Sequence, residues 1–223
     1  MTDYPGRLAA VLFCQGCPWS CVYCHNPHLI PADAPPGRDW TSTLNFLRRR
    51  VGLLDAVVFS GGEPTLQAGL ADAMNDVRRM GFQIGLHTAG PYPERLAEVL
   101  LLLDWVGFDV KAPFERYDRI SGVPGSGAKA RESLRLLVAS GVEHECRTTI
   151  HPSLFTAPQL AELSESLFAF GVRRHVLQAF RAAGCRDEAL NAAADEGAVA
   201  RLLEQANALS PRAEQRGGIG IST

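Results

Sequence analysis

Short apolar runs alternate along this chain with longer stretches in which apolar residues recur every three or four positions. The short runs have the length of strands, whereas a period near 3.6 residues is typical of an amphipathic helix. We therefore predict strands at Leu8–Phe13, Ala56–Phe59, Gln83–Leu86, Trp105–Asp109, Glu145–Ile150 and His175–Ala179. Helices are predicted at Thr43–Arg50, Ala68–Met80, Pro93–Leu103, Lys129–Ser140, Pro158–Phe170 and Asp195–Leu209.

A glycine follows several of the predicted helices, as expected where a left-handed residue ends a helix. These glycines are Gly52, Gly81, Gly141 and Gly171, and some of them recur after about 30 residues, the length of one strand–helix unit. Repetition of that unit indicates parallel strands joined by helical crossovers. A closed eight-unit barrel needs about 250 residues, so six units predict an α/β fold that is a partial, half-open parallel (βα)6 barrel.

Composition and charge narrow the possible partners and the compartment. The 223 residues, 46% of them apolar and 21% charged, predict one domain spanning 1–223. A net charge of −2 gives no reason to expect nucleic acid or an anionic membrane as a partner. No apolar run is long enough to cross a bilayer, and no export signal is found, so we expect a cytoplasmic protein with reduced thiols. The tail at about 211–223 is predicted to be flexible, or at best a short edge strand.

The candidate chemistry follows the strands. In parallel α/β folds, functional side chains gather at the carboxyl ends of the strands. Here those positions carry the segments "CQGCPWSCVYCHN", "SGGEP", "HTAG", "DVKAP", "RTTIHP" and "QAFR", which are rich in groups that bind ligands. The first of them, the cysteine loop from Cys14 to Asn26, holds four of the six cysteines.

The spacing of these cysteines is C-x2-C-x3-C-x2-C, at Cys14, Cys17, Cys21 and Cys24. A structural zinc site usually needs a longer segment between its two C-x2-C pairs. The spacing also differs from the ferredoxin run C-x2-C-x2-C-x3-C-P. Disulfides are not expected in the reducing cytosol. A four-cysteine zinc or electron-transfer protein nevertheless stays open as an alternative of a different class.

The inner spacing C-x3-C-x2-C, with an aromatic residue before its last cysteine, resembles the radical S-adenosylmethionine (SAM) superfamily. The resemblance implies that Cys17, Cys21 and Cys24 bind three irons of a [4Fe–4S] cluster. The open fourth iron would bind the amino and carboxylate groups of SAM. Cys14 is then expected to be a small, half-buried apolar residue and not a fourth ligand.

The residues after the second strand fit the same resemblance. "SGGEP" resembles the superfamily motif that holds the amino group of SAM, which assigns this contact to Gly61, Gly62 and Glu63. Taken alone, a Gly-Gly-Glu-Pro turn is an ordinary exit from a strand. Within the cysteine loop, Tyr23 and His25 are expected on the side that faces SAM.

Two further strand ends carry candidate cofactor contacts. Asp109 and Lys111 have the same side-chain parity and could both point to the open end of the strands. The resemblance implies that they contact the carboxylate or ribose of SAM, although a surface ion pair is the plain alternative. "HTAG" matches the Asp-Thr-Asn-Gly of similar proteins at Thr88 and Gly90 but departs from it at His87, whose role stays open.

The fifth and sixth strands end in polar residues that are further candidates for ligand contact. Arg147, His151 and Gln178 are candidates for holding adenosine or the substrate, although isolated polar groups of this kind are usually satisfied within the protein. Cys146 and Cys185 are expected to be structural thiols. No side chain is assigned as a catalytic acid or base, because the cluster and SAM would supply the chemistry.

"QGCP" leading into the loop and "CHN" after it resemble the glycyl-radical-enzyme activases. From Leu8 to Arg181 the chain most resembles the anaerobic ribonucleoside-triphosphate reductase activating proteins. The resemblance implies reductive cleavage of SAM and formation of a glycyl radical on that partner, with flavodoxin or ferredoxin as the electron donor. A pyruvate formate-lyase activase, or a radical SAM enzyme acting on a small molecule such as a deazapurine precursor, is an alternative. The oligomeric state stays open.

Overall fold

The computed structural model describes residues 3–35, 37–193 and 195–216. They form two compact units that are interleaved along the chain. Unit 1 consists of 1–19, 28–108 and 129–144, and unit 2 of 20–27, 109–128 and 145–223, each within the described residues. Residues 217–223 of the tail predicted to be flexible lie outside the described residues, and a single domain over the whole chain stays a prediction.

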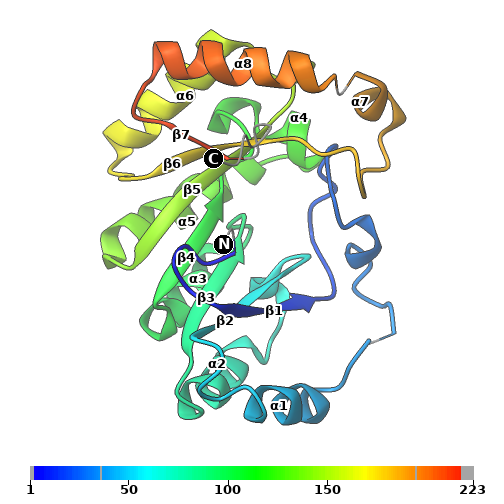
Figure 1. The fold of residues 1–223 in the computed structure, drawn as a ribbon, viewed down its shortest axis with the longest axis vertical. Coiled ribbons are helices and arrows are strands. Elements are labelled where there is room, and N and C mark those ends of the chain that lie inside the picture. The colour runs from blue at the N-terminus through cyan, green and yellow to red at the C-terminus, as the bar shows by residue number, and fades with distance from the viewer. Residues whose placement is uncertain (1–2, 36, 194, 217–223) are drawn as a thin grey trace. The chain divides into compact units, whose positions relative to one another are not determined.

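Unit 1 contains the first strands, which pair in parallel and in chain order (Figure 1). They are β1 (Ala9–Cys14), β2 (Ala56–Gly61), β3 (Gln83–Thr88) and most of β4 (Trp105–Asp109). Its helices are α1 (Trp40–Arg48), α2 (Leu70–Arg79), α3 (Pro93–Val99) and most of α5 (Ser126–Ser140), with 3-10 turns at Pro27–Leu29, Pro64–Leu66 and Leu100–Leu102. In the register of β1 with β2, Cys14 lies opposite Gly61.

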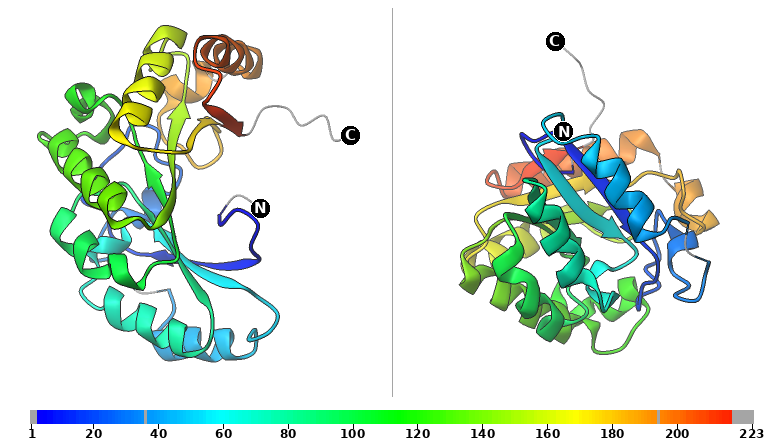
Figure 2. Two further views of the ribbon diagram at one scale, coloured as in Figure 1. Left: turned by 90° about the vertical axis from the view of Figure 1, so that its left-hand side faces the viewer. Right: turned by 90° about the horizontal axis from the view of Figure 1, so that it is seen from below.

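Unit 2 contains β5 (Glu143–Ile150, from Glu145 onward), β6 (His175–Ala179) and β7 (Glu214–Arg216), which also pair in parallel. Its helices are α4 (Asp118–Ser121), α6 (Ala157–Phe170), α7 (Glu188–Ala193) and α8 (Glu196–Leu209), with a 3-10 turn at Phe114–Arg116. Helices α6 and α8 pack against each other and against β6. Figure 2 shows the helices of each unit lying outside its strands.

The strands follow one another in the sheet in the order β1 to β7, all paired in parallel where the register is described. This order confirms the predicted fold class, a partial parallel α/β barrel. All of the predicted strands are present. β7 lies in the tail, which was predicted to be flexible or at best a short edge strand, and its sequence, Glu-Gln-Arg, has no apolar alternation. Ion pairs hold it in unit 2: Arg216 pairs with the fully buried Glu145, and Glu214 pairs with Arg174.

Capping residues explain where several helices begin and end. Asp39 is the N-cap of α1 and accepts from the Ser42 amide at 2.7 Å, so this helix begins before the predicted Thr43. Thr156 and Gln159 form a capping box at the start of α6. The same helix ends at Gly171, whose φ of 106° is accessible mainly to glycine. Local sequence therefore determines the ends of these helices.

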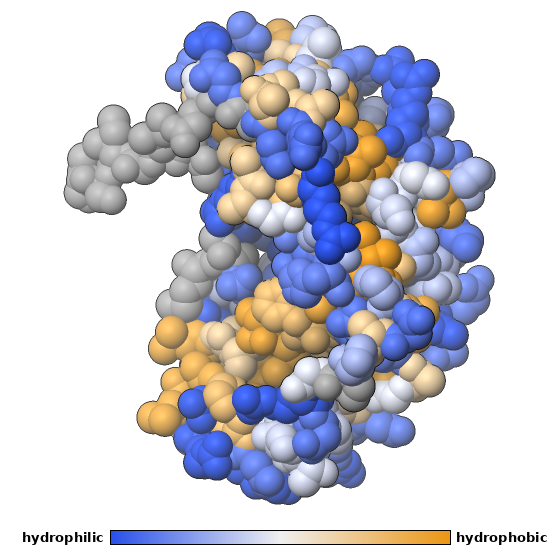
Figure 3. All heavy atoms as spheres, turned by 90° about the vertical axis from the view of Figure 1, so that its right-hand side faces the viewer, coloured by the Kyte–Doolittle hydropathy of each residue, from blue (hydrophilic) through white to orange (hydrophobic). Residues whose placement is uncertain are grey.

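The core of unit 1 lies along β2 and β3, whereas β1 is the edge strand and has no fully buried residue. Leu8, Phe13, Val51 and Leu53 are each more than half exposed. Figure 3 shows apolar side chains gathered over the lower part of one face. The edge of this unit is therefore its least covered apolar region. No helix in the described part of the chain has the length and apolar character needed to span a bilayer.

Candidate functional site

The first half of the cysteine loop, from Cys14 to Trp19, belongs to unit 1 and is held by backbone hydrogen bonds. The Gly62 amide donates to the Cys14 carbonyl at 2.9 Å, and the Glu63 amide donates to the Gly16 carbonyl at 2.8 Å. On the opposite side, the Cys17 amide donates to the Ile30 carbonyl at 3.0 Å. The Gly-Gly-Glu turn and the first half of the loop thus form one hydrogen-bonded structure.

Both glycines of this turn lie against the loop backbone. A Cβ atom on Gly61 would lie 2.4 Å from the Cys14 nitrogen, and one on Gly62 would lie 2.2 Å from the Gly16 oxygen. The φ of Gly61, 115°, also disfavours any other residue. These positions need glycine because the loop itself occupies the space of a side chain. Their predicted contact with the amino group of SAM stays a prediction.

Glu63 is buried, with 2% of its surface exposed, and its carboxylate binds several neutral donors of unit 1. Its Oε1 atom accepts from the Thr65 amide at 3.0 Å, the Thr65 hydroxyl at 2.6 Å and the Thr88 hydroxyl at 2.8 Å. Its Oε2 atom accepts from the Ala89 amide at 3.1 Å. Burial raises the pKa of Glu63, although these hydrogen bonds favour the ionised form. The side chain therefore links the turn after β2 to the end of β3.

His87, which departs from the motif of similar proteins, has a defined place in unit 1. Its Nε2 atom lies 2.8 Å from the Asp3 carbonyl, to which it must donate, and its Nδ1 atom lies 3.1 Å from the Ser60 hydroxyl. The ring meets Trp105 edge-on with centroids 5.7 Å apart. His87 therefore fastens the segment around Asp3 to the ends of β2 and β3.

The second half of the cysteine loop, from Ser20 to Pro27, belongs to unit 2 and is also held through its backbone. The Ser20 amide donates to the Ser121 carbonyl at 2.9 Å, and the Val22 amide donates to the Ile120 carbonyl at 3.0 Å. The Cys24 amide donates to the Cys21 carbonyl at 3.0 Å, which closes a turn between these two cysteines. Helix α4 thus supports this half of the loop.

His25 is directed toward the segment that follows β6. Its Nε2 atom lies 2.9 Å from the Arg181 carbonyl, and its ring lies 5.5 Å from the Phe180 ring between centroids. A Cβ atom on Gly184 would lie 2.3 Å from the His25 oxygen, so this segment and the loop are in close backbone contact. Burial lowers the pKa of His25 and favours the neutral ring. The Nε2 proton of His25 is therefore used within the protein.

Asp109 lies between two cations in unit 2. Arg147 places Nε at 3.0 Å and a terminal nitrogen at 2.9 Å from the Oδ1 atom of Asp109. The Nζ atom of Lys111 lies 3.7 Å from Oδ2 and 5.7 Å from the centroid of the Tyr23 ring. Tyr117 donates its hydroxyl to the Asp109 carbonyl at 3.0 Å. The structure thus brings together four of the predicted residues: Tyr23, Asp109, Lys111 and Arg147.

Lys111 and Cys21 influence each other's charge. Burial opposes the charged form of Lys111, but Cys21 and Asp109 favour it, so the pKa of Lys111 lies well above its ordinary value. Burial raises the pKa of Cys21, and Lys111 opposes this shift. Burial raises the pKa of Cys14 to about 12, so this thiol stays protonated at neutral pH in the structure. An ammonium group therefore favours the thiolate at Cys21.

None of the six cysteines is in a disulfide. The four in the loop are partly exposed, whereas Cys146 and Cys185 are buried, which agrees with the structural role expected of them. Within the described residues, no group of three or more His, Cys, Asp or Glu side chains is arranged to hold a single metal ion. The alternative of a four-cysteine zinc or electron-transfer protein therefore stays open.

Two further predicted residues, His151 and Gln178, have no described contact with Tyr23, Asp109, Lys111 or Arg147. His151 is fully buried, with Nε2 at 3.1 Å from the Leu190 carbonyl and Nδ1 accepting from the Ser153 amide at 3.1 Å. Both ring nitrogens are therefore used to hold the segment after β5. Gln178 lies on β6 opposite Thr149 and is partly exposed, so its proposed contact with adenosine or the substrate stays a prediction.

Sequence reasoning missed two residues that support these groups. Tyr117 accepts from the Lys111 amide at 3.1 Å and donates to the Asp109 carbonyl, and Thr65 gives Glu63 two of its donors. Thr65 lies two positions after the predicted Glu63, a spacing at which a hydroxyl can reach back to a turn. Tyr117 carried no such signal, because only the folded chain brings it under Lys111.

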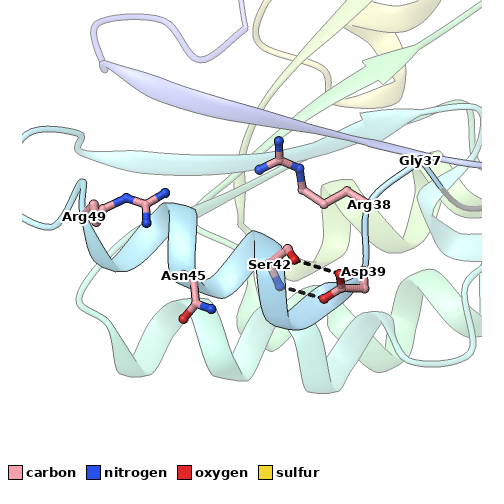
Figure 4. Close-up of a pocket in the computed structure, with 6 residues that line it drawn as sticks. All are labelled: Gly37, Arg38, Asp39, Ser42, Asn45 and Arg49. Atoms are coloured by element: carbon pink, nitrogen blue, oxygen red, sulfur yellow. Dashed lines mark hydrogen bonds between the residues drawn. The ribbon is translucent and has the colours of Figure 1, made fainter.

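One described cavity is lined by none of the predicted site residues. Figure 4 shows its lining by Gly37, Arg38, Asp39, Ser42, Asn45 and Arg49, around the start of α1 in unit 1. It is an open depression of about 480 Å³. The two oxygens of Asp39 accept from the amide and the hydroxyl of Ser42, each at 2.7 Å, so this carboxylate serves as the helix cap.

Comparison with known sequences gives consistent matches. A family model described as the radical SAM superfamily matches residues 11–156. A protein of Methanocaldococcus jannaschii, assigned as a glycyl-radical enzyme activating enzyme, is 30% identical over 74% of this chain and 70% of its own length. The pyruvate formate-lyase-activating enzyme of Clostridium pasteurianum is 31% identical over 69% of this chain and 66% of its own length.

Solved structures share the fold. The Streptococcus suis protein SuiB bound to S-adenosylmethionine superimposes with a TM-score of 0.73 at 13% identity. The match covers 96% of this chain and 51% of SuiB, so the chain spans about half the length of that protein. At this identity the likeness concerns the fold alone.

Proposed function

Because this chain belongs to the radical SAM superfamily, we propose that it is an activating enzyme that generates a glycyl radical on a partner protein. The resemblance noted from the cysteine loop is thereby confirmed, as are the enzyme class and the cofactors of the superfamily, a [4Fe–4S] cluster and SAM. The glycyl-radical activity is supported by the relatives from M. jannaschii and C. pasteurianum.

The observation that carries this proposal is the cysteine loop. Cys17, Cys21 and Cys24 are partly exposed and in no disulfide, and thiols are the donors that iron–sulfur clusters require. The loop backbone that bears them is fixed by Gly62 in unit 1 and by Ser121 in unit 2. These residues fit the cluster, and Cys17, Cys21 and Cys24 would hold it. Cys14, at the end of β1, would stay outside the ligand set.

Other residues of the chain would position SAM. The chemistry that the bound cofactors supply is one-electron cleavage of SAM followed by hydrogen abstraction from a glycine. Lys111 would offer its ammonium group to the carboxylate of SAM, and the Gly-Gly-Glu turn would receive the amino group. Tyr23 and His25 would line the loop on that side, and Thr88 would hold Glu63 in place. Asp109, Arg147 and Gln178 complete the proposed set.

We propose anaerobic ribonucleoside-triphosphate reductase as the partner, flavodoxin or ferredoxin as the electron donor and the cytosol as the compartment. The resemblance from Leu8 to Arg181 supports this choice. A pyruvate formate-lyase is the second candidate partner, because the activating enzyme of C. pasteurianum is 31% identical. No acid or base residue of the chain is assigned to the reaction.

The test is anaerobic reconstitution with iron, sulfide and SAM, followed by addition of each candidate glycyl-radical enzyme. We expect the doublet of a glycine-centred radical in the electron paramagnetic resonance spectrum with the reductase. A doublet only with the formate-lyase would favour the second candidate. Deoxyadenosine formation stimulated by a small metabolite, and by neither protein, would contradict the proposed function.

A matched pair of cysteine variants tests the ligand set. We expect Cys21→Ala to lose the cluster and SAM cleavage, whereas Cys14→Ala keeps both. Iron content and the visible absorption spectrum of the reconstituted proteins measure the first effect. Equal loss in the two variants would show that all four cysteines bind metal, as in the electron-transfer alternative.

A further inference from the structure

The contacts of Arg147 in unit 2 are not those of a residue that reaches a ligand directly. Its side chain is 7% exposed, whereas the side chain of Asp109 in front of it is 38% exposed. Two of its guanidinium nitrogens, at 3.0 and 2.9 Å, converge on the same oxygen of Asp109. Arg147 is therefore buried behind a carboxylate that itself reaches the surface.

The other oxygen of that carboxylate faces Lys111, whose side chain is 13% exposed. The three charged groups Arg147, Asp109 and Lys111 form a row with two positive charges and one negative charge. The Lys111 ammonium lies 5.7 Å from the centroid of the Tyr23 ring, and Tyr23 lies between Cys21 and Cys24 in the loop. We refer to these three residues as the charged row.

The charged row is built on rigid parts of the fold. Arg147 lies in β5, and its carbonyl accepts from the Val110 amide at 2.8 Å, between Asp109 and Lys111 in the chain. Tyr117 bonds the backbone on both sides of Val110, at the Asp109 carbonyl and the Lys111 amide. Backbone hydrogen bonds thus fix the main-chain positions from which the three side chains extend. The Asp109 carboxylate pairs with the charged groups of Arg147 and Lys111.

We propose that Arg147 is a positioning residue that acts through Asp109 to hold the Lys111 ammonium beside Tyr23, in the half of the loop that carries Cys21 and Cys24, and that the net positive charge of the row raises the reduction potential of the cluster. This inference rests on the proposed function, since it requires a cluster bound through Cys21. It assigns to Arg147 no direct contact with SAM. Added electrons on the cluster are stabilised by a nearby positive charge and destabilised by a negative one.

Redox titration of the reconstituted cluster, followed by electron paramagnetic resonance, tests the electrostatic part. Arg147→Met removes a positive charge and should move the midpoint potential to more negative values. Asp109→Asn removes the negative charge and should move it to more positive values. Arg147→Lys keeps the charge and should leave the potential close to that of the unaltered protein. The matched control is Arg119→Met, an exposed arginine of the same unit, which should cause no shift.

SAM affinity tests the positioning part. Loss of a residue that orients a ligand group typically weakens binding by about 10–100-fold. We expect Arg147→Met and Asp109→Asn each to raise the dissociation constant of SAM about tenfold. The double variant should be no weaker than the single ones, because both remove the same support from Lys111. Arg147→Lys should also weaken binding, since one ammonium cannot reproduce two nitrogens on one oxygen.

Three outcomes would overturn the inference. The first is a midpoint potential that moves in the same direction, or not at all, in Arg147→Met and Asp109→Asn. The second is additive loss of SAM affinity in the double variant, which would indicate a separate contact of Arg147. The third applies if Arg147→Met does not retain a cluster, so that only Asp109→Asn can be titrated. A midpoint potential of Asp109→Asn that is unchanged or more negative than that of the unaltered protein then overturns the proposal. Failure of the unaltered protein to bind a cluster or cleave SAM would instead contradict the proposed function.

Discussion

Two carboxylates, one in each unit, have partners of different kinds. Glu63 in unit 1 is buried and accepts from hydroxyl and amide groups, all of them neutral. Asp109 in unit 2 is partly exposed and pairs with the cations Arg147 and Lys111. The turn against the first half of the loop therefore depends on close packing and neutral hydrogen bonds. The charged row, which lies beside Tyr23 of the second half, depends on ion pairs.

The difference indicates what each half contributes. Neutral donors fix a backbone without placing a net charge near it, which suits a turn that must fit tightly against Cys14 and Gly16. A charged row can change the electrostatic potential at a nearby thiolate, which suits the segment that carries Cys21. Disturbance of unit 1 should therefore appear as lost stability that is insensitive to salt. Disturbance of unit 2 should appear as altered dependence on charge or pH.

The largest effect is expected from Gly62→Ala. The added methyl group would lie 2.2 Å from the Gly16 oxygen and 2.9 Å from the Leu29 oxygen. Both are backbone atoms, so no side-chain rotation can relieve the clash. We expect the free energy of unfolding to fall by more than about 4 kcal/mol and the cluster to be lost. Urea denaturation and iron content measure the two effects.

The matched control is Gly69→Ala, since a Cβ atom at Gly69 would meet nothing within 4 Å. It should unfold like the unaltered protein. Normal iron content in Gly62→Ala would show that the first half of the loop tolerates displacement and that the comparison overstates its rigidity.

The next effect concerns Glu63 itself. Glu63→Ala leaves the amides of Thr65 and Ala89 buried without their acceptor, so we expect a loss of about 3–5 kcal/mol. Glu63→Gln keeps one oxygen and should lose less, about 2 kcal/mol. Because the partners are neutral, both losses should be nearly the same at low and high salt. Exposed Glu98→Ala serves as the control in the same urea experiments. A strong salt dependence would contradict the neutral character of this site.

The third effect is a dependence on pH in unit 2. His175 is fully buried, with Nε2 at 2.9 Å from the Thr148 hydroxyl and Nδ1 at 3.0 Å from that of Ser164. Burial lowers its pKa to about 4, from an ordinary value near 6.5. The unfolded chain binds the proton first, so stability falls as the pH drops from about 6.5 to about 4, by about 3 kcal/mol in total. Above pH 6.5 this residue contributes no pH dependence.

Urea denaturation of the unaltered protein and of His175→Gln across pH 4 to 7 isolates this effect. The difference between the two proteins should shrink as the pH falls, because only the unaltered protein carries the histidine that must stay neutral. A difference that is constant with pH would show that burial does not lower the pKa of His175.

The smallest effect is expected from Thr88→Val. This change removes one of the hydroxyl donors to Glu63 and the acceptor of the Gly90 amide at 3.0 Å. We expect a loss of about 1–2 kcal/mol in urea denaturation, because the other donors to Glu63 remain. Thr41→Val, on the exposed face of α1, should change stability little. A loss as large as that of Glu63→Ala would mean that Thr88 alone carries the link between the turn and β3.

The sequence was sufficient for the elements whose pattern is local. The apolar runs predicted the strands, and the cysteine spacing with the Gly-Gly-Glu turn indicated the family, whereas the roles of the single site residues stay predictions. The sequence was insufficient for the position of β7, which has no apolar pattern and is held by the pairs Arg216–Glu145 and Arg174–Glu214. Likewise, a lone Arg147 in the sequence gave no indication that Asp109 would stand in front of it.

For this protein, the sequence by itself determined the kind of fold and the donor atoms, because periodicity and ligand spacing are properties of neighbouring residues. The tertiary structure alone decided what the glycines contact, which donors satisfy Glu63, and which way the charges around Lys111 are balanced. Those outcomes depend on residues that are distant in the chain. Only the folded backbone brings them within hydrogen-bonding distance.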